Sequence, residues 1–144
     1  MKTHIRRFKL SDTFIEQYKD REVPWGPLGY VTFKRTYARR LSEFDENATG
    51  TEEWFQTCRR VIEGMFEMQK QHVYRLGLEW NDQKAQRTAK NAYDRLFNLK
   101  WTPPGRGLWM MGTEFVNKRT AAGLFNCAFR STRELNTKGG YLFS

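Results

Sequence analysis

The chemistry of this chain is most readily sought at its two cysteines. Cys58 falls on the apolar stripe of an expected helix, where a thiol behaves as a small hydrophobic group. Cys127 lies between Phe125 and Phe129 in a short apolar segment that follows Gly123. A reactive cysteine needs a neighbour that stabilises the thiolate or an accessible position, and the sequence around Cys127 indicates neither. The pattern alone therefore favours a core position for both.

Metal binding is disfavoured by the positions of the potential ligands. A structural zinc site usually takes four Cys or His residues arranged in close pairs. The available residues lie far apart in the sequence: His4, Cys58, His72 and Cys127. We predict no metal site and interpret both histidines as surface residues. Two cysteines also do not make a disulfide framework.

Phosphate contact is one chemistry that the glycine-rich run Pro103–Gly107 could support. The chain has neither of the common phosphate-binding motifs, GxxxxGK[ST] and GxGxxG. Arg106 lies where the backbone is expected to turn, which makes it a candidate for facing phosphate. The same run is also typical of a plain loop that follows a helix.

A basic run at Lys34–Arg40 suggests a different function. The net charge is +9, and residues 1–40 hold ten Lys or Arg and four acids, a difference of +6. Such an excess attracts anions, and arginines interleaved with aromatic rings suit single-stranded nucleic acid. A small basic helical nucleic-acid-binding module is therefore the alternative function. A solvated basic face beside one packed tyrosine explains the run equally well.

Two long helices are expected in the middle of the chain. Thr49–Glu52 fits a capping box, so the first helix is predicted from about residue 51 to about 70, ending before Gly77. The second begins near Asn81 or Asp82 and ends before Pro103 and Pro104. Their apolar stripes are Trp54, Cys58, Val61, Ile62 and Met65, and Ala85, Ala89, Ala92, Tyr93, Leu96, Phe97 and Leu99.

The flanking segments are less regular. Residues 1–10 form a basic, poorly patterned lead, and Ser11 can cap a short helix that directs Phe14, Ile15 and Tyr18 inward. Prolines and glycines interrupt residues 24–29. The pattern of residues 30–40 fits a strand and a helix equally well, and residues 123–130 are expected to form a buried strand.

The composition and the ends of the chain set further limits. With 144 residues, the chain is expected to form one domain. It has no apolar run long enough for a membrane span and no apolar segment after Met1, so a cytoplasmic location without membrane contact is expected. The apolar ending Tyr141–Ser144 suggests an element interrupted in mid-course.

Four blocks of the sequence, in this order, resemble the opening of the monomeric class II ribonucleotide reductases, the adenosylcobalamin-dependent ribonucleoside-triphosphate reductases. The first runs from Pro24 to Arg39 and the second is Arg59–Gly64. The third comprises Pro103–Trp109 with the Gly112-Thr113 pair, and the fourth is the Asn126-Cys127 neighbourhood. The order of the blocks is far more specific than any one of them.

The resemblance implies a fold and a role for Cys127. It implies a mainly α N-terminal region leading into the first strand of a ten-stranded α/β barrel, with the barrel itself outside this chain. In that family a thiyl radical abstracts the 3′ hydrogen of the ribose, and two other cysteines supply electrons and become a disulfide. Cys127 matches the first cysteine of that redox-active pair, whose partner lies outside this chain; Cys58 has no counterpart.

The resemblance also implies ligands and partners. Asn126 would help to line the substrate pocket, and Arg106 would be structural or face phosphate. Adenosylcobalamin would be bound by other parts of the enzyme, and a thioredoxin-type reductant would regenerate the thiols. We expect a lead with a short helix over 1–22, a helical region over 23–104 and a truncated start of the barrel over 105–144, inactive without the remainder of the reductase.

Overall fold

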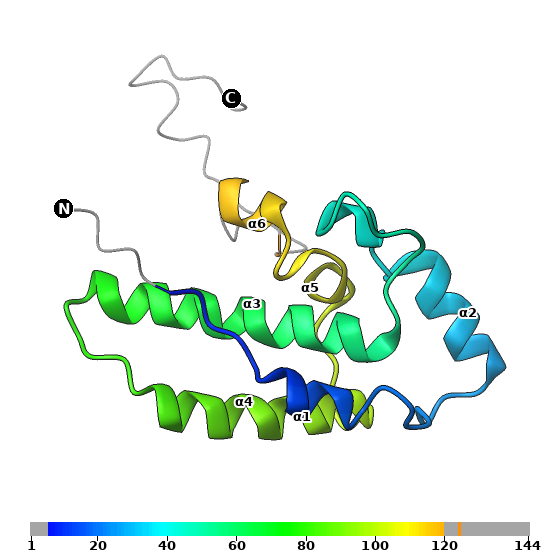
Figure 1. Ribbon diagram of the computed structural model, residues 1–144, viewed down its shortest axis with the longest axis horizontal. Coiled ribbons are helices and arrows are strands. Elements are labelled where there is room, and N and C mark those ends of the chain that lie inside the picture. Colours follow the sequence, from blue (N-terminus) through cyan, green and yellow to red (C-terminus); the bar gives the residue numbers. More distant parts are fainter. Residues whose placement is uncertain (1–5, 120–123, 125–144) are drawn as a thin grey trace, which may run out of the picture.

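The computed structural model describes residues 6–119 and residue 124, and this part of the chain is mainly helical, as predicted (Figure 1). The only β-type pairing within it is an isolated antiparallel bridge between Arg40 and Thr51. None of its helices is long and apolar enough to cross a membrane. The elements in chain order are α1 (Asp12–Glu16), α2 (Pro27–Thr36), the 3-10 helix η1 (Leu41–Glu43), α3 (Trp54–Arg75), α4 (Asp82–Phe97), α5 (Gly105–Met110) and α6 (Glu114–Arg119).

Helix α3 is the central element, and its start corrects the predicted capping box. The helix begins at Trp54 and is capped by Glu53, whose side chain accepts from the backbone N–H of Gln56. The Gln56 side chain in turn accepts from the backbone N–H of Glu53 at 2.8 Å. The predicted box at Thr49–Glu52 is wrong because Gly50 adopts a φ of +88° and Thr51 pairs with Arg40, so the backbone there is not helical.

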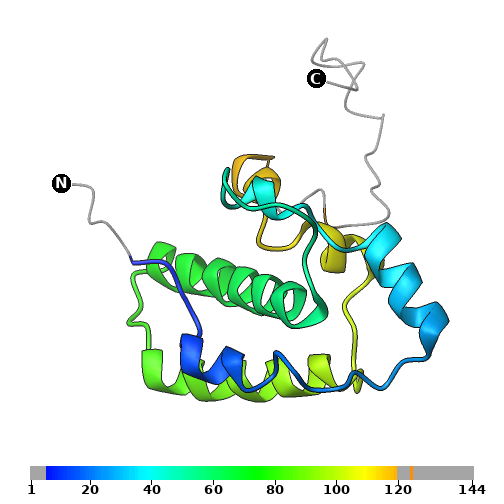
Figure 2. The same cartoon turned by 45° about the vertical axis from the view of Figure 1, so that its right-hand side comes forward.

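Helices α3 and α4 run side by side and enclose the core (Figures 1 and 2). The break between them at Gly77 is confirmed, with a φ of +70° that glycine adopts without strain. The predicted apolar stripe of α4 is also confirmed. Its buried members are Ala85, Ala89, Tyr93, Leu96 and Phe97, and they pack with the α3 residues Trp54, Cys58, Val61, Ile62 and Phe66.

The described residues of the segment before α1, expected only to be a basic lead, pack against α3. They cross α3 as an extended chain (Figure 1), and Phe8 and Leu10 are buried in the core. The backbone N–H groups of these two residues donate to the α3 carboxylates of Glu67 and Glu63, at 2.7 and 2.9 Å. An alternating pattern of only two buried residues is too short to recognise in a sequence. Helix α1 follows, with Ser11 at its N-cap position and Ile15 buried.

Two ambiguous regions are resolved as helix. Residues 27–36 form α2, with Pro27 in its first turn and Phe33 buried. The glycine-rich run after Pro103 is not a plain loop, because α5 begins at Gly105. Helices α5 and α6 lie on the opposite side of α3 from α4 (Figure 1). Apart from Leu124, the strand predicted over residues 123–130 lies outside the described residues.

Candidate functional site

The three residues singled out from the sequence are not brought together in the described structure. Cys127 and Asn126 lie outside the described residues. Arg106 is exposed, in the first turn of α5. The structure shows how residues 105–113 are attached to α3. Most of the residues that make this attachment belong to the blocks that carried the family resemblance, but no individual role was predicted for them from the sequence.

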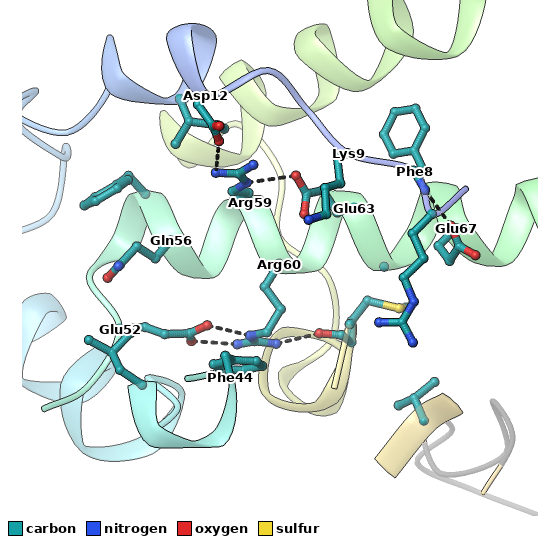
Figure 3. A pocket seen from close by; sticks show the side chains of 18 of the residues that line it. Phe8, Lys9, Asp12, Phe44, Glu52, Gln56, Arg59, Arg60, Glu63 and Glu67 are labelled. Atoms are coloured by element: carbon teal, nitrogen blue, oxygen red, sulfur yellow. Dashed lines mark hydrogen bonds and ion pairs between the residues drawn. The ribbon is translucent and has the colours of Figure 1, made fainter. Parts of the chain in front are cut away.

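A buried ion pair between Arg60 and Glu52 is the centre of this attachment. The two side chains are 6% and 3% exposed. Arg60 Nε donates to Glu52 Oε1 at 2.7 Å and Nη2 donates to Oε2 at 3.0 Å, a bidentate arrangement (Figure 3). Glu52 Oε2 also accepts from the Thr57 hydroxyl at 2.8 Å and from the backbone N–H of Arg39 at 3.1 Å. The carboxylate therefore links α3 to the residues that follow α2.

The remaining N–H groups of Arg60 bind the backbone of α5. Nη2 donates to the Leu108 carbonyl at 3.1 Å, and Nη1 donates to the carbonyls of Trp109 and Met111 at 3.4 and 2.6 Å. Guanidinium has five N–H donors, and all of them are used. The last carbonyls of a helix lack intrahelical partners, so Arg60 both fastens and caps the C-terminal end of α5.

A contact between two glycines brings the turn after α5 against α3. A Cβ added to Gly64 would lie 2.5 Å from the backbone nitrogen of Gly112. Gly112 itself has a φ of +76°, and a Cβ there would collide with the Arg60 carbonyl oxygen. The absence of both side chains is therefore what allows the backbones to approach. We call the set formed by Arg39, Glu52, Arg60, Gly64 and residues 105–113 the junction.

The basic run Lys34–Arg40 contributes to the same region. Arg39 stacks over the Trp109 ring, 5.2 Å from its centroid, and Tyr37 packs against Gly105. Lys34 Nζ donates to the Glu52 carbonyl at 3.1 Å and pairs with Glu53. Two of the four cations of the run are thus committed to contacts within the chain, which weakens the nucleic-acid-binding alternative. Arg35 and Arg40 are exposed.

Cys58 has the buried position that its helical stripe predicted. Its side chain is fully enclosed, and burial raises the pKa of the thiol well above its ordinary value. The thiolate is the reactive form of cysteine, so this position suits an inert thiol. The prediction that His72 is a surface residue is confirmed. Within residues 6–119, no group of three or more His, Cys, Asp or Glu side chains could hold a metal ion.

A groove of about 640 Å³ lies along the face of α3 (Figure 3). Its floor is α3, one wall is the extended segment with α1, and the other wall is formed by η1 and the residues around α5 and α6. The lining includes Arg7, Lys9 and Lys19 on the first wall, Phe44, Met111 and Val116 on the second, and Phe55, Glu63, Glu67 and Met68 on the floor.

Comparison with known proteins places this chain in a family. Residues 10–113 match the ribonucleotide reductase alpha domain. This match covers most of the chain and contains the first three blocks recognised in the sequence. The chain therefore belongs to the ribonucleotide reductase alpha domain family, and the predicted family is confirmed.

The chain is similar to proteins named as adenosylcobalamin-dependent reductases. The chain is 41% identical over 138 residues to a probable adenosylcobalamin-dependent ribonucleoside-triphosphate reductase of Dictyostelium discoideum, covering 94% of this chain and 18% of that protein. It is 39% identical over 143 residues to the adenosylcobalamin-dependent ribonucleoside-triphosphate reductase of Euglena gracilis, covering 95% and 19%. The chain thus spans less than a fifth of the length of these relatives.

A solved structure supports the same relationship. The crystal structure of a B-12 dependent (class II) ribonucleotide reductase matches with a TM-score of 0.67 and 36% sequence identity. The match covers 83% of this chain and 16% of that one. The helical arrangement described above is therefore shared with a small part of a class II reductase, and the barrel is not among the described residues.

Proposed function

We propose that this chain is the N-terminal region of an adenosylcobalamin-dependent ribonucleoside-triphosphate reductase, which converts ribonucleoside triphosphates to 2′-deoxyribonucleotides. The observation that carries the proposal is the match of residues 10–113 to the reductase alpha domain. The junction supports it, because the blocks that carried the family resemblance meet there. Arg60 and Gly64 of the second block contact residues 108–112, and Tyr37 and Arg39 of the first contact Gly105 and Trp109.

In this proposal Cys127 supplies one thiol of the redox-active pair, and the second thiol comes from outside this chain. The two thiols give up two electrons and two protons and form a disulfide. The ribose loses its 2′ hydroxyl as water and gains hydrogen at the same carbon. Exchange with a thioredoxin-type dithiol then restores both thiols, which requires an accessible thiolate and a nearby partner sulfur.

The junction gives the region before Cys127 a fixed base. Arg60 and the close contact between Gly64 and Gly112 hold residues 105–113 against a long helix of the core. A rigid support matters because a reactive group must be held close to its productive geometry. Asn126 is proposed to line the ribose pocket. Arg106, exposed at the start of α5, is proposed either to face phosphate or to serve a structural role.

Adenosylcobalamin is assigned to parts of the enzyme outside this chain. On the floor of the groove, Glu63 and Glu67 already accept hydrogen bonds from the extended segment. No step through the cofactor is therefore derived from these residues.

The test is a chimera in which this chain replaces the matching region of the Dictyostelium discoideum relative, to which it is 41% identical. We expect the chimera to reduce ribonucleoside triphosphates when adenosylcobalamin and a dithiol reductant are supplied. A chimera that folds, as judged by its circular dichroism and thermal transition, but forms no deoxyribonucleotide would contradict the proposed function. The relative without this region is the control and should be inactive.

A further inference from the structure

The groove along α3 presents apolar side chains to its opening. Phe44, on its second wall, is 50% exposed, and Met68, Met111 and Val116 line the same space. Trp109 and Phe115, on α5 and α6, are 45% and 49% exposed and extend the apolar character of that side. Large exposed apolar side chains that gather on one side of a domain often mark an interaction site.

The charged groups of the groove floor are already satisfied within the chain. Glu63 accepts from the backbone of Leu10 and pairs with Arg59 at 2.8 Å. Glu67 accepts from the backbone of Phe8 and from the Gln71 side chain. An occupant therefore gains little from polar contacts with the floor and must bind mainly through apolar contact.

The wall formed by the extended segment and α1 adds a preference in charge. Arg7, Lys9 and Lys19 line the groove, are exposed, and make no ion pair within the described part of the chain. Glu16 is an acid on the same wall that likewise makes no such pair. Asp12, which pairs with Arg59, is a second acid on this wall. Three cations and two acids leave a net excess of +1, so this wall favours carboxylates on the occupant.

We propose that the groove is the docking site for an apolar segment, flanked by carboxylates, from the later part of the reductase polypeptide. The inference rests on the proposed function. Two observations favour this occupant over others. The chain spans only 18% of its Dictyostelium relative, so most of the enzyme remains to be placed against it. Val116 of α6 lines the groove wall, so the last described helix lies beside the groove.

Hydroxyl-radical footprinting of the chimera and of the 144-residue chain tests the proposal. We expect oxidation of Phe44 and Met68 to be severalfold slower in the chimera than in the chain alone. Tyr74, which is 42% exposed and lies outside the groove, is the reference and should change little. Equal oxidation of Phe44 and Met68 in both proteins would overturn the proposal. Strong protection in the chain alone would also overturn it, because residues after 119 or a second copy would then fill the groove.

A pair of variants keeps the test independent of activity. Phe44→Asp places a charge in the groove, and we expect it to lower the thermal midpoint of the chimera while leaving that of the isolated chain nearly unchanged. Leu76→Asp, at a 59% exposed position after α3, is the matched control and should affect neither. Equal effects of Phe44→Asp on both proteins would overturn the docking proposal. An inactive chimera with a protected groove would instead count against the proposed function alone.

Discussion

Arg60 is the residue on which the attachment of α5 depends. Its side chain is 6% exposed, pairs with a carboxylate that is itself buried, and donates to the carbonyls of Leu108, Trp109 and Met111 at the end of α5. Burying two charges is costly, and good geometry with full hydrogen bonding is what offsets that cost. Within the described residues, no buried side-chain nitrogen or oxygen lacks a partner. The pair is therefore fully satisfied, and its value to the protein lies in fixing one arrangement of α3 and α5.

Removing one partner of this pair should be strongly destabilising. Arg60→Met leaves the Glu52 carboxylate buried without its cation, and we expect the free energy of unfolding to fall by about 3 kcal/mol or more. Glu52→Gln with Arg60→Met should cost clearly less than Arg60→Met alone, because no uncompensated charge remains. Urea unfolding of the chain measures both. A loss below about 1 kcal/mol for Arg60→Met, typical of an exposed pair, would contradict this account.

Buried, ion-paired residues such as Arg60 and Glu52 are difficult to predict from sequence patterns. Arg60 and Glu52 are charged residues within a mixed-charge region, and a charged residue on a helix is usually exposed. Their burial depends on α5, which is more than 40 positions away in the chain. The inert character of Cys58 was predictable by contrast, because its neighbours at helical spacing are apolar. Cys127 stays a prediction that rests on family resemblance.

At the scale of elements, Gly64 determines how closely the turn after α5 approaches α3. A glycine inside a helix normally weakens it by about 0.5–1 kcal/mol relative to alanine. Here the added methyl group would meet the Gly112 backbone at 2.5 Å. Backbone cannot move aside as easily as the end of a flexible side chain. Replacing this glycine with alanine is therefore expected to destabilise the protein, although the same change usually stabilises a helix.

Gly64→Ala should therefore destabilise the chain by about 1–3 kcal/mol, the range seen when a well-packed contact is overfilled. We also expect faster hydrogen exchange at the amides of α5, since its support is displaced. The amides of α4, on the other side of α3, serve as an internal reference and should change much less. An increase in stability after this substitution would show that the two backbones are not in close contact.

Helical periodicity predicted α3, α4 and the break between them because their stripes are long and regular. It failed for short elements, where tertiary contacts decide the conformation. The extended segment with Phe8 and Leu10 is too short to show a period. The pattern of residues 30–40 fits a strand and a helix equally well, and only the structure shows that α2 extends to Thr36 with Phe33 buried. The start of α3 was misplaced because Glu53, rather than a serine or threonine, caps it.

For the molecule as a whole, the described chain resembles one part of a larger enzyme. It has a core of its own between α3 and α4, yet its opposite face carries a groove and exposed aromatic side chains. It spans less than a fifth of the length of two relatives that are named as ribonucleoside-triphosphate reductases. Composition and charge could not predict this. The +9 net charge is equally compatible with a nucleic-acid-binding module. The order of the sequence blocks is what favoured the reductase over that alternative.

The most direct test of the central claim is the turnover of the chimera with Cys127→Ser, using a thioredoxin-type reductant. We predict that multiple turnover is abolished, because the pair can no longer form a disulfide. Cys58→Ala is the matched control: it should keep its turnover while losing about 1 kcal/mol of stability from the vacated core. Sustained turnover by the Cys127→Ser chimera would contradict the redox role assigned to this residue.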